Sequence, residues 1–358
     1  MILPKIKPSS PCFSSGPTKK PDEWSLQKIN HQYFGRYHRS DDVKLYVLKI
    51  LQKIRKTLKI PKTHKIFLLP GSCTGAMNSV IWSLLDEKRS ITSIIYDYWA
   101  QIWFDELKKL NLKVDCRKSL DGSIPNLEKI PKENDLIFVW TGTSTGMTVS
   151  NLDFISNDHR GLVISDITSA AFIYEIPWDK LDVAVFSWQK ALGSESQHGI
   201  AIISPKAGNR ISKKNNVPKI LDLNEYDYLI NTPSLLSIAD FELCLDIYNS
   251  KGGVSGNAKI CKENKSILDI WEKKSDFINH FSKLACYQAL TPSYFVFKKE
   301  FKYKKLFKFL SDQKIAYDIQ NYRKARPGIR VWTGPTIKKK DLITLTNWLD
   351  WSFNKFIK

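Results

Sequence analysis

The sequence predicts an α/β fold: a large domain with a mostly parallel sheet covered by helices on both faces, followed by a smaller C-terminal α+β domain. Two observations support this prediction. Short apolar runs alternate with segments of helical periodicity as far as Ile203, a pattern typical of strands joined by crossover helices. Beyond Pro233 the helical segments become longer and the strand-like runs fewer. With 358 residues and a hydrophobic content of 42%, the chain can bury a large core.

The elements of the large domain follow in chain order. Apolar residues in the segment 41–58 keep a helical period, and Asp41 is placed to cap that helix. Further helices are expected at 75–85 and 99–110. We expect strands at 66–69, 93–96, 136–140, 162–165, 183–186 and 200–203.

The C-terminal part is expected to contain helices at 234–249 and 255–271, separated by a break at Lys251-Gly252-Gly253. A strand at 294–297 and helices at 304–311 and 340–356 complete it. We therefore divide the chain into an N-terminal arm (1–12), a large domain (13–253) and a small C-terminal domain (254–358).

The chain carries a formal net charge of +19, which is typical of proteins that bind phosphate backbones. Its lysines recur from Lys5 to Lys358 and do not gather in one segment. This spread favours a lysine-rich protein whose field attracts anionic substrates. A basic nucleic-acid-binding protein on a degenerate enzyme fold remains the alternative of a different class.

The six cysteines show no C-x-x-C spacing and no histidines at metal-ligand intervals, so we expect reduced thiols and no metal site. Prolines interrupt the short apolar stretch at the N-terminus, and no run approaches the length of a membrane span. We therefore expect a soluble, cytoplasmic protein with neither a membrane nor a nucleic acid as partner.

Lys190 and Asp166 are the first candidate catalytic residues. The apolar run 183–186 leads to Lys190 in a turn of small residues, and Asp166 ends the earlier run 162–165. Both side chains are expected at the carboxyl edge of the sheet, where open α/β sheets bind ligands. Pyridoxal phosphate requires such a pair, a lysine for its aldehyde and a carboxylate for its ring nitrogen. On this segment alone, a solvated lysine remains the alternative for Lys190.

Two loops rich in small and hydroxylated residues, 70–76 and 140–146, follow strands at the same edge. The first precedes a helix, whose N-terminal amides and dipole favour an anion. Ordinary turns share this composition, and neither loop matches a Walker or dinucleotide-binding pattern. Nucleotide binding therefore has no support from motifs.

Motifs spread over nearly the whole chain resemble those of the phosphoserine aminotransferases, a family of class V, fold-type I pyridoxal-phosphate enzymes. Each motif is weak evidence when taken alone. The resemblance rests on their occurring together in the same order as in the family. In chain order the motifs are Phe13-Ser-Ser-Gly-Pro17, Tyr37-His-Arg39, Ser72-x-Thr-Gly-Ala76, Gly142-Thr143, Ser165-Asp166, Trp188-Gln-Lys190, Asn231-Thr-Pro233 and Arg326-Pro-Gly-Ile-Arg330.

The resemblance implies that Lys190 forms a Schiff base with pyridoxal 5′-phosphate and that Asp166 pairs with the pyridine nitrogen. It implies that Thr143 hydrogen-bonds the phenolic oxygen. Trp99 is implied to stack on the ring face, although Tyr98 and Trp103 are aromatic residues close to that position in the sequence.

The phosphate of the cofactor is implied to lie against Cys73, Thr74 and Gln189. In the family, an Asn-Thr pair from the neighbouring subunit completes this phosphate site, and Asn231 and Thr232 match it. The resemblance therefore implies a homodimer with shared active sites.

Four further residues are implied to bind substrate. Arg330 is implied to pair with the α-carboxylate through its guanidinium fork, assisted by Ser15 from the N-terminal segment. His38 and Arg39 are implied to reach from the other subunit to the phosphate of phosphoserine or the side-chain carboxylate of glutamate. Without the resemblance, Arg330 is a candidate surface arginine, and the His38-Arg39 pair simply flanks a helix start.

The sequence departs from one branch of the family, which carries an arginine where this chain has Thr74. Phosphate recognition then requires other cations, and Arg323 and Lys324 are the candidates.

The implied reaction transfers an amino group between L-glutamate and 3-phosphohydroxypyruvate, giving O-phospho-L-serine and 2-oxoglutarate in serine biosynthesis. The related phosphohydroxythreonine step of vitamin B6 (pyridoxine) synthesis is a possible second reaction. The alternatives among enzymes are other class V members, such as an alanine–glyoxylate-type aminotransferase or a cysteine desulfurase. A desulfurase needs a mobile nucleophilic cysteine, and we expect Cys286, which lies among apolar residues, to be buried instead.

Overall fold

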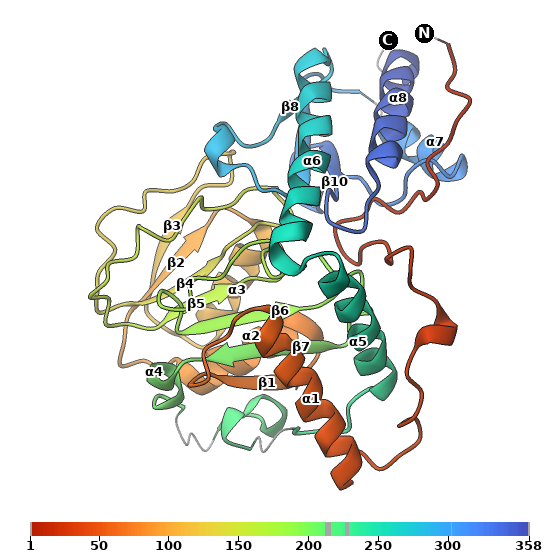
Figure 1. Ribbon diagram of the computed structural model, residues 1–358. Helices are drawn as coiled ribbons and strands as arrows, with labels where there is room; N and C mark the ends of the chain where they lie inside the picture. The colour runs from red at the N-terminus through yellow and green to blue at the C-terminus, as the bar shows by residue number, and fades with distance from the viewer. Residues whose placement is uncertain (1, 212–215, 226–228, 302, 357–358) are drawn as a thin grey trace.

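A seven-stranded sheet forms the centre of the molecule in the computed structural model, which describes residues 2–211, 216–225, 229–301 and 303–356 (Figure 1). Its strand order is β1-β7-β6-β5-β4-β2-β3. Neighbouring strands are parallel except at β7, which runs antiparallel to both β1 and β6. The predicted mostly parallel sheet is therefore confirmed. The strands are β1 (Lys65–Pro70), β2 (Ile91–Ile95), β3 (Val114–Lys118), β4 (Asp135–Val139), β5 (Val163–Asp166), β6 (Val183–Ser187) and β7 (His198–Ile203).

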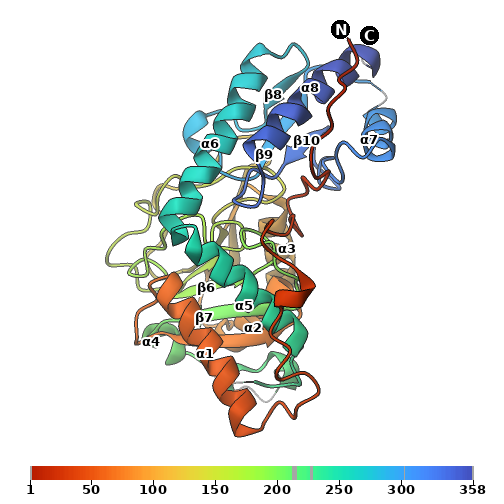
Figure 2. The same cartoon turned by 45° about the vertical axis from the view of Figure 1, so that its right-hand side comes forward.

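Helices cover both faces of this sheet (Figures 1 and 2). On one face lie α1 (Asp41–Thr57) and α5 (Leu235–Ser250), and on the other lie α2 (Ser72–Leu84), α3 (Tyr98–Lys109) and the short α4 (Pro205–Gly208). Side chains of one strand alternate between the two cores: Leu68 joins the core under α1 and α5, and Leu69 joins the core under α2 and α3. Coverage of both faces explains why β4, β5 and β6 are buried along their whole length.

A second, antiparallel sheet of order β10-β9-β8 belongs to the C-terminal part of the chain. Its core contains large aromatic residues, among them Trp271, Phe295 and Phe353. Short 3₁₀ turns occur at Leu26–Lys28, Lys219–Leu221, Leu223–Glu225 and Ala285–Tyr287. The strands and helices of this part are β8 (Ile278–His280), β9 (Ser293–Phe297), β10 (Gly328–Val331), α6 (Gly253–Lys274), α7 (Tyr303–Asp312) and α8 (Lys339–Phe356).

The N-terminal segment packs on this C-terminal part, and both termini lie at the same end of the molecule (Figure 2). Asp341 accepts hydrogen bonds from the amide and the hydroxyl of Ser9, each 2.7 Å long. The Trp348 indole donates to the Ile6 carbonyl at 2.7 Å, and Phe13 is buried in the aromatic core. The first residues of the chain thus contact its last helix. The domain boundaries proposed from the sequence stay predictions.

Several details differ from the sequence-based expectations. Ser40, not Asp41, occupies the N-cap of α1, and α2 begins at Ser72, because left-handed Gly71 (φ +79°) turns the chain directly into it. The strands β3, β8 and β10 were not predicted, because none of them is a continuous apolar run. Cys286 is exposed rather than buried, because its 3₁₀ turn leaves even the neighbouring Leu284 exposed.

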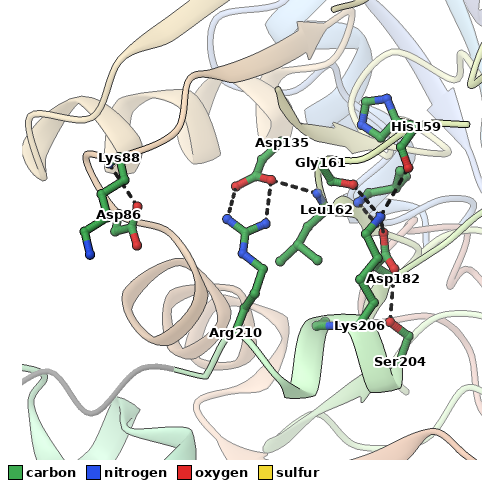
Figure 3. Close-up of polar contacts among 12 residues, drawn as sticks. Asp86, Lys88, Asp135, His159, Gly161, Leu162, Asp182, Ser204, Lys206 and Arg210 are labelled. Carbon is green, nitrogen blue, oxygen red and sulfur yellow. Dashed lines mark hydrogen bonds and ion pairs between the residues drawn. The ribbon is translucent and has the colours of Figure 1, made fainter. Parts of the chain in front are cut away.

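Ion pairs hold the amino edge of the sheet (Figure 3). Arg210 donates two hydrogen bonds, of 2.7 and 2.8 Å, to the carboxylate of Asp135 at the start of β4. Asp182, before β6, accepts from Ser204 at 3.0 Å and Lys206 at 2.9 Å. These charges satisfy one another at the edge opposite Lys190.

Within the described residues, no helix has both the length and the apolar character of a membrane span.

Candidate active site

A cleft of about 410 Å³, partly open to solvent, lies at the carboxyl edge of the large sheet. Its walls come from the segments that follow β1, β2, β4, β5 and β6, because parallel strands end at one edge. Seven of the residues predicted from the sequence line the cleft: Cys73, Thr74, Trp99, Thr143, Asp166, Gln189 and Lys190.

Lys190 lies in the turn after β6 and is only 7% exposed. Its Nζ donates a hydrogen bond to the carbonyl of Ser15, and a Cβ on Gly16 would lie 2.2 Å from that nitrogen. Burial and the nearby charge of Arg330 lower the pKa of Lys190 to about 7, although Asp166 and Asp97 oppose this shift. A substantial fraction of the amine is therefore neutral near pH 7, as a nucleophile requires.

Asp166 ends β5 at the floor of the cleft and is 4% exposed. Its Oδ1 accepts from the amide and the hydroxyl of Thr168, at 2.9 and 2.6 Å, and its Oδ2 accepts from the Trp103 indole at 3.1 Å. Burial raises the pKa of Asp166, and these hydrogen bonds lower it. The sequence reasoning missed Thr168, and considered Trp103 only as a substitute for Trp99.

The N-terminus of α2 forms one end of the cleft. Ser72, Cys73 and Thr74 line this space. The Ser72 amide donates to the Gln197 carbonyl at 3.1 Å, so helix geometry leaves the amides of Cys73 and Thr74 to face the cleft. The Oε1 atom of Gln189 is buried without a hydrogen-bond partner among the described residues. The thiol of Cys73 points elsewhere, because it interacts with Asp166, and burial raises its pKa. The donors that this end of the cleft offers to an anion are therefore the Cys73 and Thr74 amides, whereas the Gln189 oxygen is an acceptor.

Asp97 fixes two walls of the cleft and was missed in the sequence. Its Oδ1 accepts from the amide of Trp99 at 2.8 Å, and its Oδ2 accepts from the amides of Ser144 and Thr145 at 2.9 and 3.1 Å. One fully buried carboxylate thus ties the start of α3 to the loop that carries Thr143. In the sequence, Asp97 is recognisable only as an aspartate of the type that caps the N-terminus of a helix.

Arg330 lies on β10 beside the cleft. Its Nη1 donates to the Thr143 carbonyl at 3.1 Å, and its Cζ lies 5.8 Å from the centre of the Tyr322 ring. Its Nε and the hydroxyl of Ser15 are both buried without partners among the described residues. The structure therefore brings Arg330 and Ser15 to Lys190 from opposite ends of the chain.

Four predicted residues do not line the cleft of their own chain. His38 and Arg39 precede α1, and Asn231 and Thr232 precede α5. Arg39 and Thr232 are exposed, and the Asn231 amide donates to the Thr232 carbonyl at 3.2 Å. Burial and the charge of Arg39 lower the pKa of His38. These four residues therefore lie outside the cleft that Lys190 and Asp166 line.

The cleft fits the cofactor that the resemblance implies. It offers a buried lysine of lowered pKa, a carboxylate fixed at its floor, an indole at its wall and an anion site at a helix N-terminus. The unpartnered Gln189 oxygen and Arg330 Nε are further groups that a bound molecule can satisfy. Such an arrangement can bind an aldehyde-bearing phosphate ester and a carboxylate side by side.

Comparison with known proteins supports the same conclusion. No family model matches the chain. A phosphoserine aminotransferase of Methanosarcina mazei is 36% identical over 369 aligned residues, which cover 99% of each chain. The pyridoxal-phosphate-bound phosphoserine aminotransferase of Trichomonas vaginalis superposes with a TM-score of 0.81 at 16% identity, covering 95% of this chain and 99% of that one. The pyridoxamine–pyruvate aminotransferase of Mesorhizobium loti superposes with a TM-score of 0.85 at 16% identity, covering 99% and 94%. The structural matches show a shared fold, and the match in sequence distinguishes the family.

Proposed function

This chain belongs to the phosphoserine aminotransferase family, and we propose that it transfers the amino group of L-glutamate to 3-phosphohydroxypyruvate, giving O-phospho-L-serine and 2-oxoglutarate. The observation that supports this most directly is the buried pair of Lys190 and Asp166 in one cleft beside an anion site. The cofactor of the proposal is pyridoxal phosphate, which the Trichomonas vaginalis relative binds. Cytoplasmic localisation and activity on phosphohydroxythreonine are part of the same proposal.

When bound, pyridoxal phosphate supplies an aldehyde that takes up the amino group and a ring that draws electrons from the reacting carbon. Lys190 would hold the aldehyde carbon of this group through its Nζ, and as a neutral amine it would move the proton of the substrate α-carbon. Asp166 would hold a proton at the ring nitrogen. Thr143 would donate to the phenolic oxygen, and Trp99 would pack on the ring face.

Two groups at the cleft recognise anions. The first-turn amides of α2, with Thr74 and Gln189, hold the phosphate of the cofactor. Arg330 pairs with the substrate α-carboxylate, because its Nε has no partner among the described residues and part of its fork is available. The hydroxyl of Ser15 is free to assist in the same way.

A second copy of the chain completes the site in this proposal. His38 and Arg39 then meet the distal anionic group of the substrate, and Asn231 and Thr232 meet the cofactor phosphate. Apolar side chains that are more than half exposed lie close to these pairs in the sequence, which supports an interface between copies. These side chains are Leu26 (69%), Tyr37 (65%), Leu45 (66%) and Leu236 (54%). Arg323 and Lys324, both exposed, remain the candidate cations for phosphate in the absence of a loop arginine.

The visible spectrum of the purified protein tests the cofactor assignment. We expect a pyridoxal-type band that borohydride fixes to Lys190, identified by peptide mass, and no such adduct in Lys190→Met. Absence of the band refutes the enzyme assignment. Half-reactions with phosphoserine, glutamate and alanine test the substrate, because each should convert the band at its own rate. A faster response to alanine than to phosphoserine refutes the substrate assignment.

Mixed subunits test the shared site. Lys190→Met and Arg39→Ala proteins are each expected to be nearly inactive alone. After joint refolding, a heterodimer carries one intact site, with Lys190 from one subunit and Arg39 from the other, so about a quarter of the native activity returns with random pairing. A mixture that stays as inactive as its components shows that Arg39 does not act across subunits.

A further inference from the structure

The carboxylate of Asp166 is held by donors from two elements, and this arrangement assigns roles to residues that the family resemblance leaves without one. We propose that Trp103 and Thr168 are positioning residues for Asp166, which keep its carboxylate ionised and aimed at the ring nitrogen of the cofactor. This inference rests on the proposed function, because it requires a pyridine ring in the cleft.

The protein donors around Asp166 leave its carboxylate one hydrogen-bonding position for a further strong donor. A carboxylate accepts about four hydrogen bonds, two on each oxygen. Thr168 fills two of them on Oδ1, at 2.9 and 2.6 Å, and the Trp103 indole fills one on Oδ2, at 3.1 Å. The thiol of Cys73 also touches the carboxylate, but a thiol is a weak donor. Oδ2 therefore has room for one strong donor from the cleft, such as a protonated ring nitrogen.

Trp103 is suited to this task because, within the part of the chain that the structure describes, its indole N–H bonds to Asp166 and to no other group. It is 1% exposed, and a buried indole N–H generally finds an acceptor. Its position on α3, one turn beyond Trp99, lets the same helix place one indole at the wall of the cleft and another behind Asp166. The two ring centres are 6.0 Å apart. A shift of α3 would therefore move both groups together.

The electrostatics support the same role. Burial raises the pKa of Asp166 above its usual value, and the bonds from Thr168, Trp103 and Cys73 offset only part of this rise. The titratable groups that face the carboxylate are Cys73 from α2 and Lys190 from the turn after β6. Removing the donor of either Trp103 or Thr168 therefore increases the fraction of Asp166 that is protonated. An uncharged Asp166 no longer holds a proton on the ring nitrogen, so the nitrogen that links Lys190 to the ring becomes more basic.

The test compares the holoenzyme with Trp103→Phe and Thr168→Val, which keep the shape and remove one donor each. Both are expected to bind pyridoxal phosphate about ten-fold more weakly, as the loss of a hydrogen bond to a charged group implies. In both, the pH midpoint of the visible band is expected to rise. Thr168→Ser, which keeps the hydroxyl, should restore the native midpoint.

A matched control is available between helices α6 and α8 of the C-terminal part. The Trp271 indole donates to Asp350 at 2.7 Å, which is the same type of bond at a site outside the cleft. Trp271→Phe should leave both readouts at native values. Native-like affinity and midpoint in Trp103→Phe and Thr168→Val overturn the inference, and Thr168→Val decides alone if Trp103→Phe does not fold. A native protein without a visible band overturns the proposed function and this inference together, whereas a native band with unchanged variants overturns the inference alone.

Discussion

Replacing Lys190 by methionine is expected to change how the stability of the cofactor-free protein depends on pH. Burial and the charge of Arg330 lower the pKa of Lys190 from 10.5 to about 7 in the folded state. In the unfolded chain the amine is solvated and keeps its ordinary pKa. The shift corresponds to roughly 5 kcal/mol of preference for the neutral amine, because each pKa unit is worth about 1.4 kcal/mol. Methionine has a similar length and no charge, so it removes this contribution.

The sign follows from proton binding. Between pH 7 and pH 10.5 the unfolded chain binds a proton that the folded chain lacks, so the free energy of unfolding rises with pH. Below pH 7 the amine is charged in both the folded and the unfolded state, so the folded state bears the full cost of burying a charged amine. Above pH 10.5 it is neutral in both states, and the contribution vanishes. From pH 7.5 to pH 9.5, Lys190 therefore adds about 2.5 kcal/mol to the unfolding free energy of the native sequence.

Urea unfolding at pH 7.5, 8.5 and 9.5 measures this difference. The Lys190→Met protein should be the more stable of the two at pH 7.5, and its advantage should shrink by about 2.5 kcal/mol by pH 9.5. Lys308→Met is the control, because the Lys308 side chain is 77% exposed and pairs with Asp312 on the surface of α7. Its stability curve should run parallel to that of the native protein. Equal pH slopes for the native protein and Lys190→Met would refute the claim that the buried amine is held neutral.

Three further changes probe other parts of the structure. Arg330→Gln is expected to lower kcat/KM about a hundred-fold, mainly through KM, because it removes the charged donor of a buried carboxylate site. Steady-state kinetics with glutamate measure this. Arg210→Ala is expected to lower the unfolding free energy by about 3 to 5 kcal/mol, because it leaves the 1% exposed Asp135 without its ion-pair partner, and urea unfolding reports it. Gly16→Ala is expected to weaken cofactor loading, because its Cβ would displace the end of the Lys190 side chain, whereas Gly208→Ala, with open space around it, should load normally; the visible absorbance of the bound cofactor measures both.

The position of the proposed catalytic pair could be predicted from the sequence for a simple physical reason. Strands buried on both faces are continuous apolar runs, and the polar residue that ends each run marks the carboxyl edge of a parallel sheet. Asp166 and Lys190 are such residues. The direction of β7 could not be predicted in this way, because an apolar run has no polarity of its own.

Other residues of the site could not be predicted, because they depend on tertiary pairing. Arg330 reaches the cleft only because β10 pairs with β9 and its amide bonds to the Ile319 carbonyl. From the local sequence alone, Arg330 is interpreted as a surface arginine. Only the family resemblance identified it as a residue of the site. Asp97 looks like an ordinary helix cap, and its bonds to the loop around Thr143 span more than forty residues of chain. Neither pattern nor periodicity carries that information.

Selectivity for anions in this cleft is local and does not follow from the total charge of the protein. The carboxylates of Asp97 and Asp166 are saturated or nearly so by donors from the protein. Among the described residues, Arg330 keeps an unsatisfied Nε, and in the first turn of α2 the Ser72 amide is bonded to Gln197 while those of Cys73 and Thr74 face the cleft. An anion that enters the cleft therefore meets unpaired donors in a partly desolvated space, where charges interact strongly. The scattered surface lysines that give the net charge of +19 act through solvent, where salt screens them beyond about 8 Å. Their removal should slow the encounter with substrate and weaken its salt dependence, while affinity for the carboxylate stays with Arg330.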